Sequence, residues 1–321
     1  MPKVFVTREI PDAGIKLLKE AGHEVEVSDF DGVLPREQLL SKVKGADAVL
    51  SLLTDKVNAE FFDAVGPQLK VVANYAVGYD NIDVPEAKKR NIIATNTPGV
   101  LTESVAEMAI ALIFAVARRI AEADRFMRGG NYHGWAPLML LGNDIAGKKL
   151  GLVGLGRIGA VVAERMKKGF DMEVLYNDVS RNAELEEKLG IKYVDLNELL
   201  EQADFISIHV PLLPVTKHLI GSAQLKRMKK TAYLINTSRG PVVDEAALVE
   251  ALKNGIIRGA GLDVFEAEPA MAPGLAELDN VVVAPHIASA TEETRSAMSE
   301  LAAKNIIAVL AGQEPITPIK L

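Results

Sequence analysis

Alternation of short β-branched segments with amphipathic ones constrains the fold of this chain more than any other feature. In the first hundred residues, the segments predicted as strands are residues 4–7, 48–52, 71–74 and 92–95. The segments with helical spacing of apolar side chains are residues 12–21, 36–44 and 58–65. This order, with short connections, predicts a parallel sheet covered by helices on both faces.

A second series of the same kind fills the rest of the chain. Its predicted strands are residues 149–153, 173–177, 205–209, 232–236, 259–263 and 281–284. One long helix is predicted before them, at 103–128, and another after them, at 292–311. Six strands with interleaved helices are typical of a doubly wound dinucleotide fold. We therefore predict an α/β protein of two doubly wound parallel-sheet domains, Rossmann-like or flavodoxin-like, with an active-site cleft between them.

Length and composition exclude several classes of protein. At about 100 to 200 residues per domain, 321 residues suggest two domains, each able to bury its own core. Cysteine is absent, which excludes disulfides, thiolate nucleophiles and cysteine-bound zinc, and no metal site is expected. The net charge of −7 disfavours nucleic acid as a partner. We find no apolar run of membrane-spanning length and no signal-peptide pattern, so a cytoplasmic protein is expected.

A glycine-rich turn follows the predicted strand at 149–153. Its sequence, Gly-Leu-Gly-Arg-Ile-Gly at 154–159, leads into a helix, and the next strand ends at Asp178. Glycines there allow a tight turn, the approach of a pyrophosphate and close helix packing. An acid in the position of Asp178 binds the ribose of NAD and repels the 2′-phosphate of NADP. We predict NAD(H) as cofactor, with NADP(H) left open by Arg181, three residues further on.

Polar side chains follow three later strands of this series. Arg239 follows residues 232–236, Asp263 ends 259–263 and is followed by Glu268, and His286 follows 281–284. Reduction of a 2-oxo acid needs a cation for the carboxylate, a proton donor for the carbonyl oxygen and a positioned nicotinamide. No tyrosine has a lysine four positions later, which excludes the short-chain reductase mechanism.

These motifs resemble those of the D-isomer-specific 2-hydroxyacid dehydrogenase family. The matching segments are residues 76–83, 154–159, 236–240, 261–269 and 285–291. Within the family, residues 7–11 and 74–81 are most similar to glyoxylate and hydroxypyruvate reductases. The resemblance implies a discontinuous substrate-binding domain at residues 1–99 plus 288–321 and a dinucleotide-binding domain at residues 100–287.

The resemblance also implies a role for each polar group. Arg239 would bind the substrate carboxylate and carbonyl, and His286 would be the general acid in reduction. Glu268 would orient His286 and favour its protonated form near neutral pH. Asp263 would hold the nicotinamide end of the cofactor. His209 is a rival base, which the resemblance places beside the adenosine instead.

Further residues are assigned to ligands by the same resemblance. The cofactor-binding candidates are Thr102, Gly154, Gly156, Arg157, Ile158, Gly159, Asp178, His209, Val210, Pro211, Thr216, Thr237, Ser238 and Asp263. The substrate-binding candidates are Leu53, Ala76, Val77, Gly78, Trp135, Arg239 and His286. Backbone N–H groups of Val77 and Gly78 would complete the carboxylate site. Thr102 is equally well interpreted as a helix N-cap, and Trp135 either reaches a neighbouring subunit's substrate pocket or is buried in a dimer interface.

The predicted function is NAD(P)H-dependent reduction of a small 2-oxo acid, glyoxylate or hydroxypyruvate, to the D-2-hydroxy acid. A homodimer is expected, formed through the apolar run at 106–117 and the loop around Trp135, with no membrane partner. The alternatives are a D-lactate or other D-2-hydroxyacid dehydrogenase and a phosphoglycerate dehydrogenase. A non-enzymatic, NAD-sensing scaffold resembling a corepressor is the alternative from another class, because a fold does not prove a function.

Overall fold

The structure is a computed structural model that describes residues 1–320. The chain forms two compact units, which we name unit 1 (Met1–Leu101 with Ser289–Leu321) and unit 2 (Thr102–Ala288). The predicted domain boundaries, 99/100 and 287/288, lie beside these limits. In the described part of the chain, no helix is both long and apolar enough to cross a membrane.

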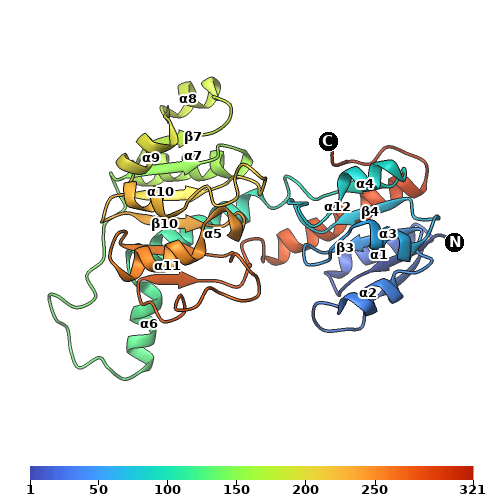
Figure 1. Ribbon diagram of the computed structural model, residues 1–321, viewed down its shortest axis with the longest axis horizontal. Coiled ribbons are helices and arrows are strands. Elements are labelled where there is room, and N and C mark those ends of the chain that lie inside the picture. The colour runs from blue at the N-terminus through green and yellow to red at the C-terminus, as the bar shows by residue number, and fades with distance from the viewer. Residues whose placement is uncertain (321) are drawn as a thin grey trace. The chain divides into compact units, whose positions relative to one another are not determined.

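Unit 1 is built on a five-stranded parallel sheet in the order β2-β1-β3-β4-β5. Figure 1 labels two of its strands, β3 and β4, among the helices of this unit. Its elements are β1 (Lys3–Val6), α1 (Asp12–Glu20), β2 (Glu24–Val27), α2 (Arg36–Lys42), β3 (Ala48–Ser51), α3 (Ala59–Val65), β4 (Val71–Asn74), α4 (Val84–Lys89), β5 (Ile93–Thr95) and α12 (Glu292–Leu310). This order is that of flavodoxin-like sheets. The inner strands β3 and β4 are buried along their whole length, including their polar last residues, Ser51 and Asn74.

The last helix, α12, packs on α1 of the same unit. The N–H of Gly14 in α1 donates to the hydroxyl of Ser299 in α12 at 3.1 Å. A Cβ at position 14 would lie 2.2 Å from the carbonyl oxygen of Ser299. The two helices therefore touch at a point that only glycine permits.

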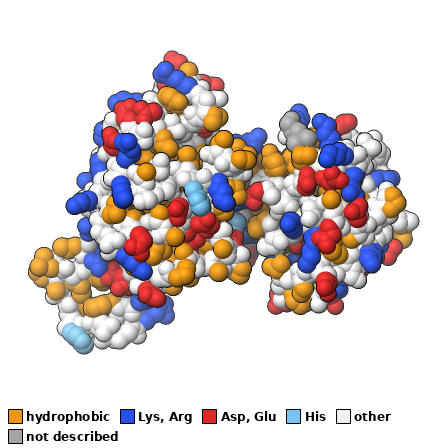
Figure 2. Space-filling view, in the orientation of Figure 1, with side chains coloured by type: hydrophobic (Ala, Val, Ile, Leu, Met, Phe, Trp, Pro, Cys, Tyr) orange, Lys and Arg blue, Asp and Glu red, His pale blue; other side chains and the backbone are white. Residues whose placement is uncertain are grey.

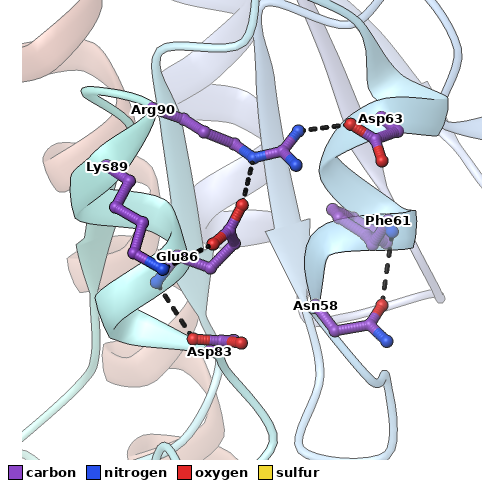
Figure 3. A network of polar contacts seen from close by, with 7 residues as sticks. All are labelled: Asn58, Phe61, Asp63, Asp83, Glu86, Lys89 and Arg90. Carbon is purple, nitrogen blue, oxygen red and sulfur yellow. Dashed lines mark hydrogen bonds and ion pairs between the residues drawn. The ribbon is translucent and has the colours of Figure 1, made fainter.

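Arg90, which follows α4, joins α3 and α4 at the surface of unit 1. Its guanidinium donates to Glu86 in α4 and to Asp63 in α3 (Figure 3). Asn58 and Asp83 cap the two helices by accepting from backbone N–H groups of their first turns. The network fixes the ends of two loops, 52–58 and 75–83, that carry candidate site residues.

Unit 2 is built on a seven-stranded parallel sheet in the order β12-β11-β10-β9-β6-β7-β8. Its helices are α5 (Thr102–Ala117), α6 (Ile120–Arg128), α7 (Arg157–Phe170), α8 (Ala183–Leu189), α9 (Leu196–Gln202), α10 (Ser222–Arg227), the 3₁₀ helix η1 (Gly240–Val242) and α11 (Glu245–Lys253). Its strands are β6 (Lys149–Val153), β7 (Glu173–Asn177), β8 (Lys192–Tyr193), β9 (Phe205–Ile208), β10 (Tyr233–Asn236), β11 (Gly259–Leu262) and β12 (Val281–Val283). The sheet order reverses between β6 and β9, the switch point where open α/β sheets bind ligands.

Two clusters of buried apolar side chains cover the two faces of this sheet. One joins α5 and α7 to the sheet, and the other joins α9, α10 and α11 to it. Helix α5 lies close to β11 at Gly261, where a Cβ would lie 3.0 Å from the Cβ of Leu112. Two faces covered by helices confirm the predicted fold class, two parallel-sheet α/β domains.

Two details of the prediction for unit 2 are wrong. The single helix predicted at 103–128 is two helices, α5 and α6, because Arg119 adopts a left-handed backbone conformation (φ 54°) that ends the first helix. The carbonyl of Ala117 at that end accepts from the N–H of Asn143 at 2.9 Å. The six strands predicted for the second half are seven, since the two-residue strand β8 pairs with β7. A strand of two residues is too short to show a period.

Candidate active site

The three glycines between β6 and α7 have different surroundings. Gly154 has φ +98°, and a Cβ on it would lie 2.9 Å from the backbone of His209. A Cβ on Gly159 would lie 2.4 Å from the carbonyl oxygen of Gly154. A Cβ on Gly156 would meet nothing within 4 Å. The fold requires the first and third glycines, whereas the second leaves open space through which the backbone can be approached.

These surroundings fit the pyrophosphate of a dinucleotide. Helix α7 begins at Arg157, and its N-cap, Gly156, offers no side chain to the N–H groups of the first turn. Such a helix end attracts anions. The hydroxyl of Thr237, directly after β10, is buried and has no partner among the described residues. A buried hydroxyl of this kind needs a hydrogen-bonding group, which a polar ligand can provide.

Asp178 follows β7 and binds the glycine loop. One carboxylate oxygen accepts from the N–H of Leu155 at 2.7 Å and the other from the N–H of Ser180 at 3.3 Å. A negative charge therefore lies beside the glycine loop, while the contact of Asp178 with a ribose stays a prediction. The guanidinium of Arg181 is bound by Glu186, with a shortest N···O distance of 2.6 Å.

Arg239 lies in the turn after β10, which Asn236 holds in shape. The side-chain oxygen of Asn236 accepts from the N–H and the hydroxyl of Ser238, and its amide donates to the carbonyl of Arg239. Arg239 is half-buried, and its Nη1 donates to the carbonyl of Ser238 at 2.8 Å. A Cβ on the next residue, Gly240, would lie 1.8 Å from the carbonyl oxygen of Phe265. The arginine turn thus packs directly on the loop that carries Glu268.

Glu268 and His286 form a pair in unit 2. Nδ1 of His286 lies 2.9 Å from one carboxylate oxygen of Glu268, and the other oxygen accepts from the N–H of Phe265 at 3.0 Å. Burial alone would raise the pKa of the Glu268 carboxyl. The hydrogen bond and charge of His286, the N–H of Phe265 and the nearby charge of Arg239 outweigh burial and lower that pKa. Glu268 is therefore a carboxylate that interacts with both other members of the predicted catalytic set.

Asp263 holds the backbone on which His286 lies. His286 has a left-handed conformation (φ 54°), unusual for a residue with a side chain. Its N–H donates to the carbonyl of Asp263, and the carboxylate of Asp263 accepts from the N–H groups of Ile287 and Ala288, each at 2.8 Å. Asp263 is fully buried, and burial raises its pKa against these hydrogen bonds. Its predicted contact with the nicotinamide stays a prediction; the structure adds that it positions the histidine loop.

His209 follows β9 and lies against the glycine loop. Its Nε2 is 2.9 Å from the hydroxyl of Ser207, and its N–H donates to the carbonyl of Val153 at 2.7 Å. Burial lowers its pKa to about 4. Val210 and Pro211 continue from it, and the hydroxyl of Thr216 donates to the carbonyl of Pro211 at 2.7 Å. This segment borders the loop predicted to bind the dinucleotide.

The substrate-binding candidates of unit 1 lie on two loops joined by amide side chains. Asn74, at the end of β4, donates to the carbonyl of Gly78 at 2.9 Å. Asn81 donates to the carbonyl of Leu52 at 3.1 Å, beside the predicted Leu53, and also contacts Asn74. No described group accepts from the N–H of Val77 or Gly78. Their predicted role as donors to a carboxylate stays a prediction, and so does the assignment of Ala76 to the substrate site.

Comparison with known proteins identifies the family. Residues 110–288 match the NAD binding domain of D-isomer specific 2-hydroxyacid dehydrogenases. A glyoxylate reductase of Korarchaeum cryptofilum is 54% identical over 316 residues, which cover 98% of this chain and 94% of that protein. The chain belongs to the D-isomer-specific 2-hydroxyacid dehydrogenases. It is therefore an NAD(P)-dependent oxidoreductase.

Solved structures resemble this dehydrogenase over its full length. A protein from Thermus thermophilus is 44% identical, with a TM-score of 0.93 and coverage of 99% of this chain and 100% of that one. An NADPH-dependent glyoxylate/hydroxypyruvate reductase from Sinorhizobium meliloti, in complex with NADP and malonate, is 35% identical, with a TM-score of 0.86 and coverage of 99% and 96%.

Two further residues of the dehydrogenase, Thr102 and Trp135, were predicted to bind ligands. Helix α5 begins at Thr102 itself, so this threonine is the first helical residue and not the residue before the helix. Trp135 is 80% exposed in the loop after α6. The assignments of these two residues to cofactor and substrate stay predictions.

Sequence reasoning missed the polar residues that support the site loops. Asp55 in unit 1 is buried and accepts from the N–H of Leu52 and from the hydroxyl of Thr7. Glu245 in unit 2 is buried and accepts from the N–H groups of Glu266 and Ala272, on the loop that carries Glu268. Neither residue ends a strand, so only the tertiary structure identifies them. For Asn74 a signal did exist, because it is a polar residue at the end of a buried strand.

Proposed function

We propose that this dehydrogenase reduces glyoxylate or hydroxypyruvate with NADH, using Arg239, His286 and Glu268. The observation that carries the proposal is the 2.9 Å contact between His286 and Glu268, in unit 2 with Arg239 and the glycine loop. Similarity to glyoxylate reductases over 98% of the chain supports the choice of substrate.

The geometry divides the work among these side chains. Because Nδ1 of His286 is engaged by Glu268, its Nε2 is the atom left to donate a proton to the substrate carbonyl oxygen. Glu268, as a carboxylate, engages Nδ1 and holds the imidazole ring in one orientation. The planar guanidinium of Arg239 suits a carboxylate, which it can meet with two parallel hydrogen bonds. Bound NADH would supply the hydride for the carbonyl carbon.

NADH is proposed over NADPH because of the charges beside the glycine loop. The carboxylate of Asp178 would repel a 2′-phosphate, and Arg181 is engaged by Glu186. Thr237 and the open space at Gly156 would serve either cofactor.

We propose a homodimer, supported by exposed apolar side chains on one segment of unit 2. Trp135 and Leu138 are each 80% exposed, and Ile120, Met127 and Leu141 are more than half exposed on α6 and the loop after it. Figure 2 shows apolar side chains gathered on the projecting part where Figure 1 draws this loop. Patches of this kind mark interaction sites. A cytoplasmic location stays a prediction.

Initial rates of NADH and NADPH consumption with several oxo acids test the proposed function. We expect glyoxylate and hydroxypyruvate to be reduced fastest, and with NADH. Faster reduction of pyruvate would favour a D-lactate dehydrogenase, and of 3-phosphohydroxypyruvate a phosphoglycerate dehydrogenase. No consumption with any oxo acid would favour a non-enzymatic scaffold.

A further inference from the structure

Three side chains from β7, α8 and the loop between them form a closed arrangement. Nε of Arg181 lies 2.8 and 3.0 Å from the two carboxylate oxygens of Glu186, and Nη2 lies 2.6 Å from one of them. The hydroxyl of Tyr176 donates to the same carboxylate at 2.6 Å and accepts from the N–H of Asn182 at 2.7 Å. We name Arg181, Glu186 and Tyr176 the arginine clamp.

The acidic side chain of the clamp, Glu186, is largely buried, whereas its basic side chain, Arg181, is exposed. Tyr176 is fully buried in β7, and its ring packs edge-on against Tyr193 at 5.4 Å between centroids. The side chain of Glu186 is only 12% exposed, whereas that of Arg181 is 67% exposed. Arg181 and Tyr176 lower the pKa of Glu186 to about 2. Glu186 is therefore charged throughout the physiological pH range and keeps hold of the guanidinium.

The clamp lies at the end of the strand that follows the glycine loop, so it can affect which cofactor is preferred. The end of the strand after the glycine loop is where dinucleotide folds distinguish a ribose 2′-hydroxyl from a 2′-phosphate. From residue 177 to residue 187, Arg181 is the one cation, against Asp178, Glu184, Glu186 and Glu187. Asp178 is held separately, by the N–H groups of Leu155 and Ser180. Repulsion by Asp178 and engagement of Arg181 are thus two independent features, and each disfavours the binding of a 2′-phosphate.

We propose that Glu186 is a specificity-determining residue: by binding Arg181, it withholds from a 2′-phosphate the one cation of this loop. The inference rests on the proposed function, since it deepens the preference for NADH. Release of Arg181 would create a guanidinium able to meet a phosphate in bidentate fashion, the usual arginine contact with that group.

The test is the affinity of the full-length protein for adenosine 2′,5′-bisphosphate and for 5′-AMP, measured by titration calorimetry. Glu186→Gln keeps the size of the side chain and an acceptor for Tyr176 but removes the charge that binds Arg181. We expect this variant to bind the bisphosphate about tenfold more tightly and to bind 5′-AMP as the unaltered protein does. The KM for NADPH should fall in parallel.

Three further variants separate the clamp from a general change of charge. Glu187→Gln, one residue away on α8, removes the same charge without touching Arg181 and should bring no comparable gain. Arg181→Ala alone should leave bisphosphate binding unchanged, since its guanidinium is already engaged. Added to Glu186→Gln, Arg181→Ala should abolish the gain.

Each contrary result has a distinct meaning. A gain that persists without Arg181, an equal gain in Glu187→Gln, or weaker bisphosphate binding in Arg181→Ala alone would overturn the clamp while leaving the proposed function intact. Failure of the unaltered protein to bind 5′-AMP and to oxidise NADH with glyoxylate would overturn the proposed function and the clamp with it.

Discussion

At the scale of single residues, the carboxylate of Glu268 links the histidine to the arginine. It lies 2.9 Å from Nδ1 of His286, and its pKa, which burial would raise, is instead lowered by His286, by the N–H of Phe265 and by Arg239. A lowered pKa keeps Glu268 ionised well below neutral pH.

Glu268→Gln tests the role of that charge. The variant keeps a hydrogen-bond acceptor for the imidazole but removes the negative charge beside it. We expect the rate of reduction to fall roughly ten- to a hundredfold, because the carboxylate that engages the proton donor is lost. Rates measured with glyoxylate across the pH range check this. Glu266→Gln is the matched control, because Glu266 binds His218 instead of His286; an unchanged rate in Glu268→Gln would contradict the role.

His209 should make the stability of the protein depend on pH. Burial lowers its pKa to about 4 in the folded chain, against about 6.5 when unfolded. Between these values the unfolded chain binds a proton that the folded chain does not. The stabilisation is therefore complete above about pH 6.5 and declines as the pH falls toward 4, by about 3 kcal/mol.

Urea midpoints at pH 5 and pH 7.5 measure this dependence. In His209→Asn, the difference between the two midpoints should shrink. In His133→Asn, which alters an exposed loop, it should stay as it is in the unaltered protein. Equal differences in all three proteins would show that His209 titrates normally.

At the scale of elements, the glycine loop contains two glycines that the fold requires, Gly154 and Gly159, and one that the ligand requires, Gly156. Gly156→Ala introduces a Cβ that meets no protein atom, at φ −71°, which any residue adopts. We expect a normal melting temperature and an NADH affinity weakened about tenfold or more. Gly154→Ala should lower the melting temperature, because its Cβ would lie 2.9 Å from the backbone of His209 and its φ is +98°. Normal NADH binding by Gly156→Ala would contradict the assignment of the loop.

The local sequence pattern predicted most helices and strands. It failed where a contact with a residue far away in the sequence determines the structure. The strands β3, β4, β6, β9 and β10 are apolar runs that stay buried, so composition alone identifies them. Strand β2 was missed because its sequence, EVEV, is exposed or half-buried and pairs only at the edge of the sheet. The end of α5 depends on Asn143, which binds the carbonyl of Ala117 across 26 residues.

The same distinction holds for the site. Arg239 and His286 each follow a strand, which is where the polar residues of a site are expected in a parallel sheet. Their positions in the sequence were therefore enough to predict them as site residues. The clamp of Arg181 by Glu186, and the hold of Asp263 on the histidine loop, depend on side-chain directions that spacing does not define. From the sequence alone, Arg181 left NADP(H) open as a cofactor. The structure shows that Arg181 is engaged by Glu186.

At the scale of the whole molecule, the exposed apolar loop predicts association. Light scattering should give twice the mass of the chain. Replacing Trp135 and Leu138 together with serine should shift the protein toward the monomer, because both side chains are 80% exposed in unit 2. Val33→Ser, at an exposed position of unit 1, should leave the mass unchanged. A monomeric mass for the unaltered protein would contradict the proposed dimer.

The central claim is that His286 donates the proton when this dehydrogenase reduces a small oxo acid. Its most direct test is the initial rate of NADH oxidation with glyoxylate in the unaltered protein, in His286→Asn and in His209→Asn. We predict steady oxidation by the unaltered protein, a loss on the order of 10² or more in His286→Asn, and a change of a few-fold at most in His209→Asn. Near-normal oxidation by His286→Asn, or the larger loss in His209→Asn, would contradict the account.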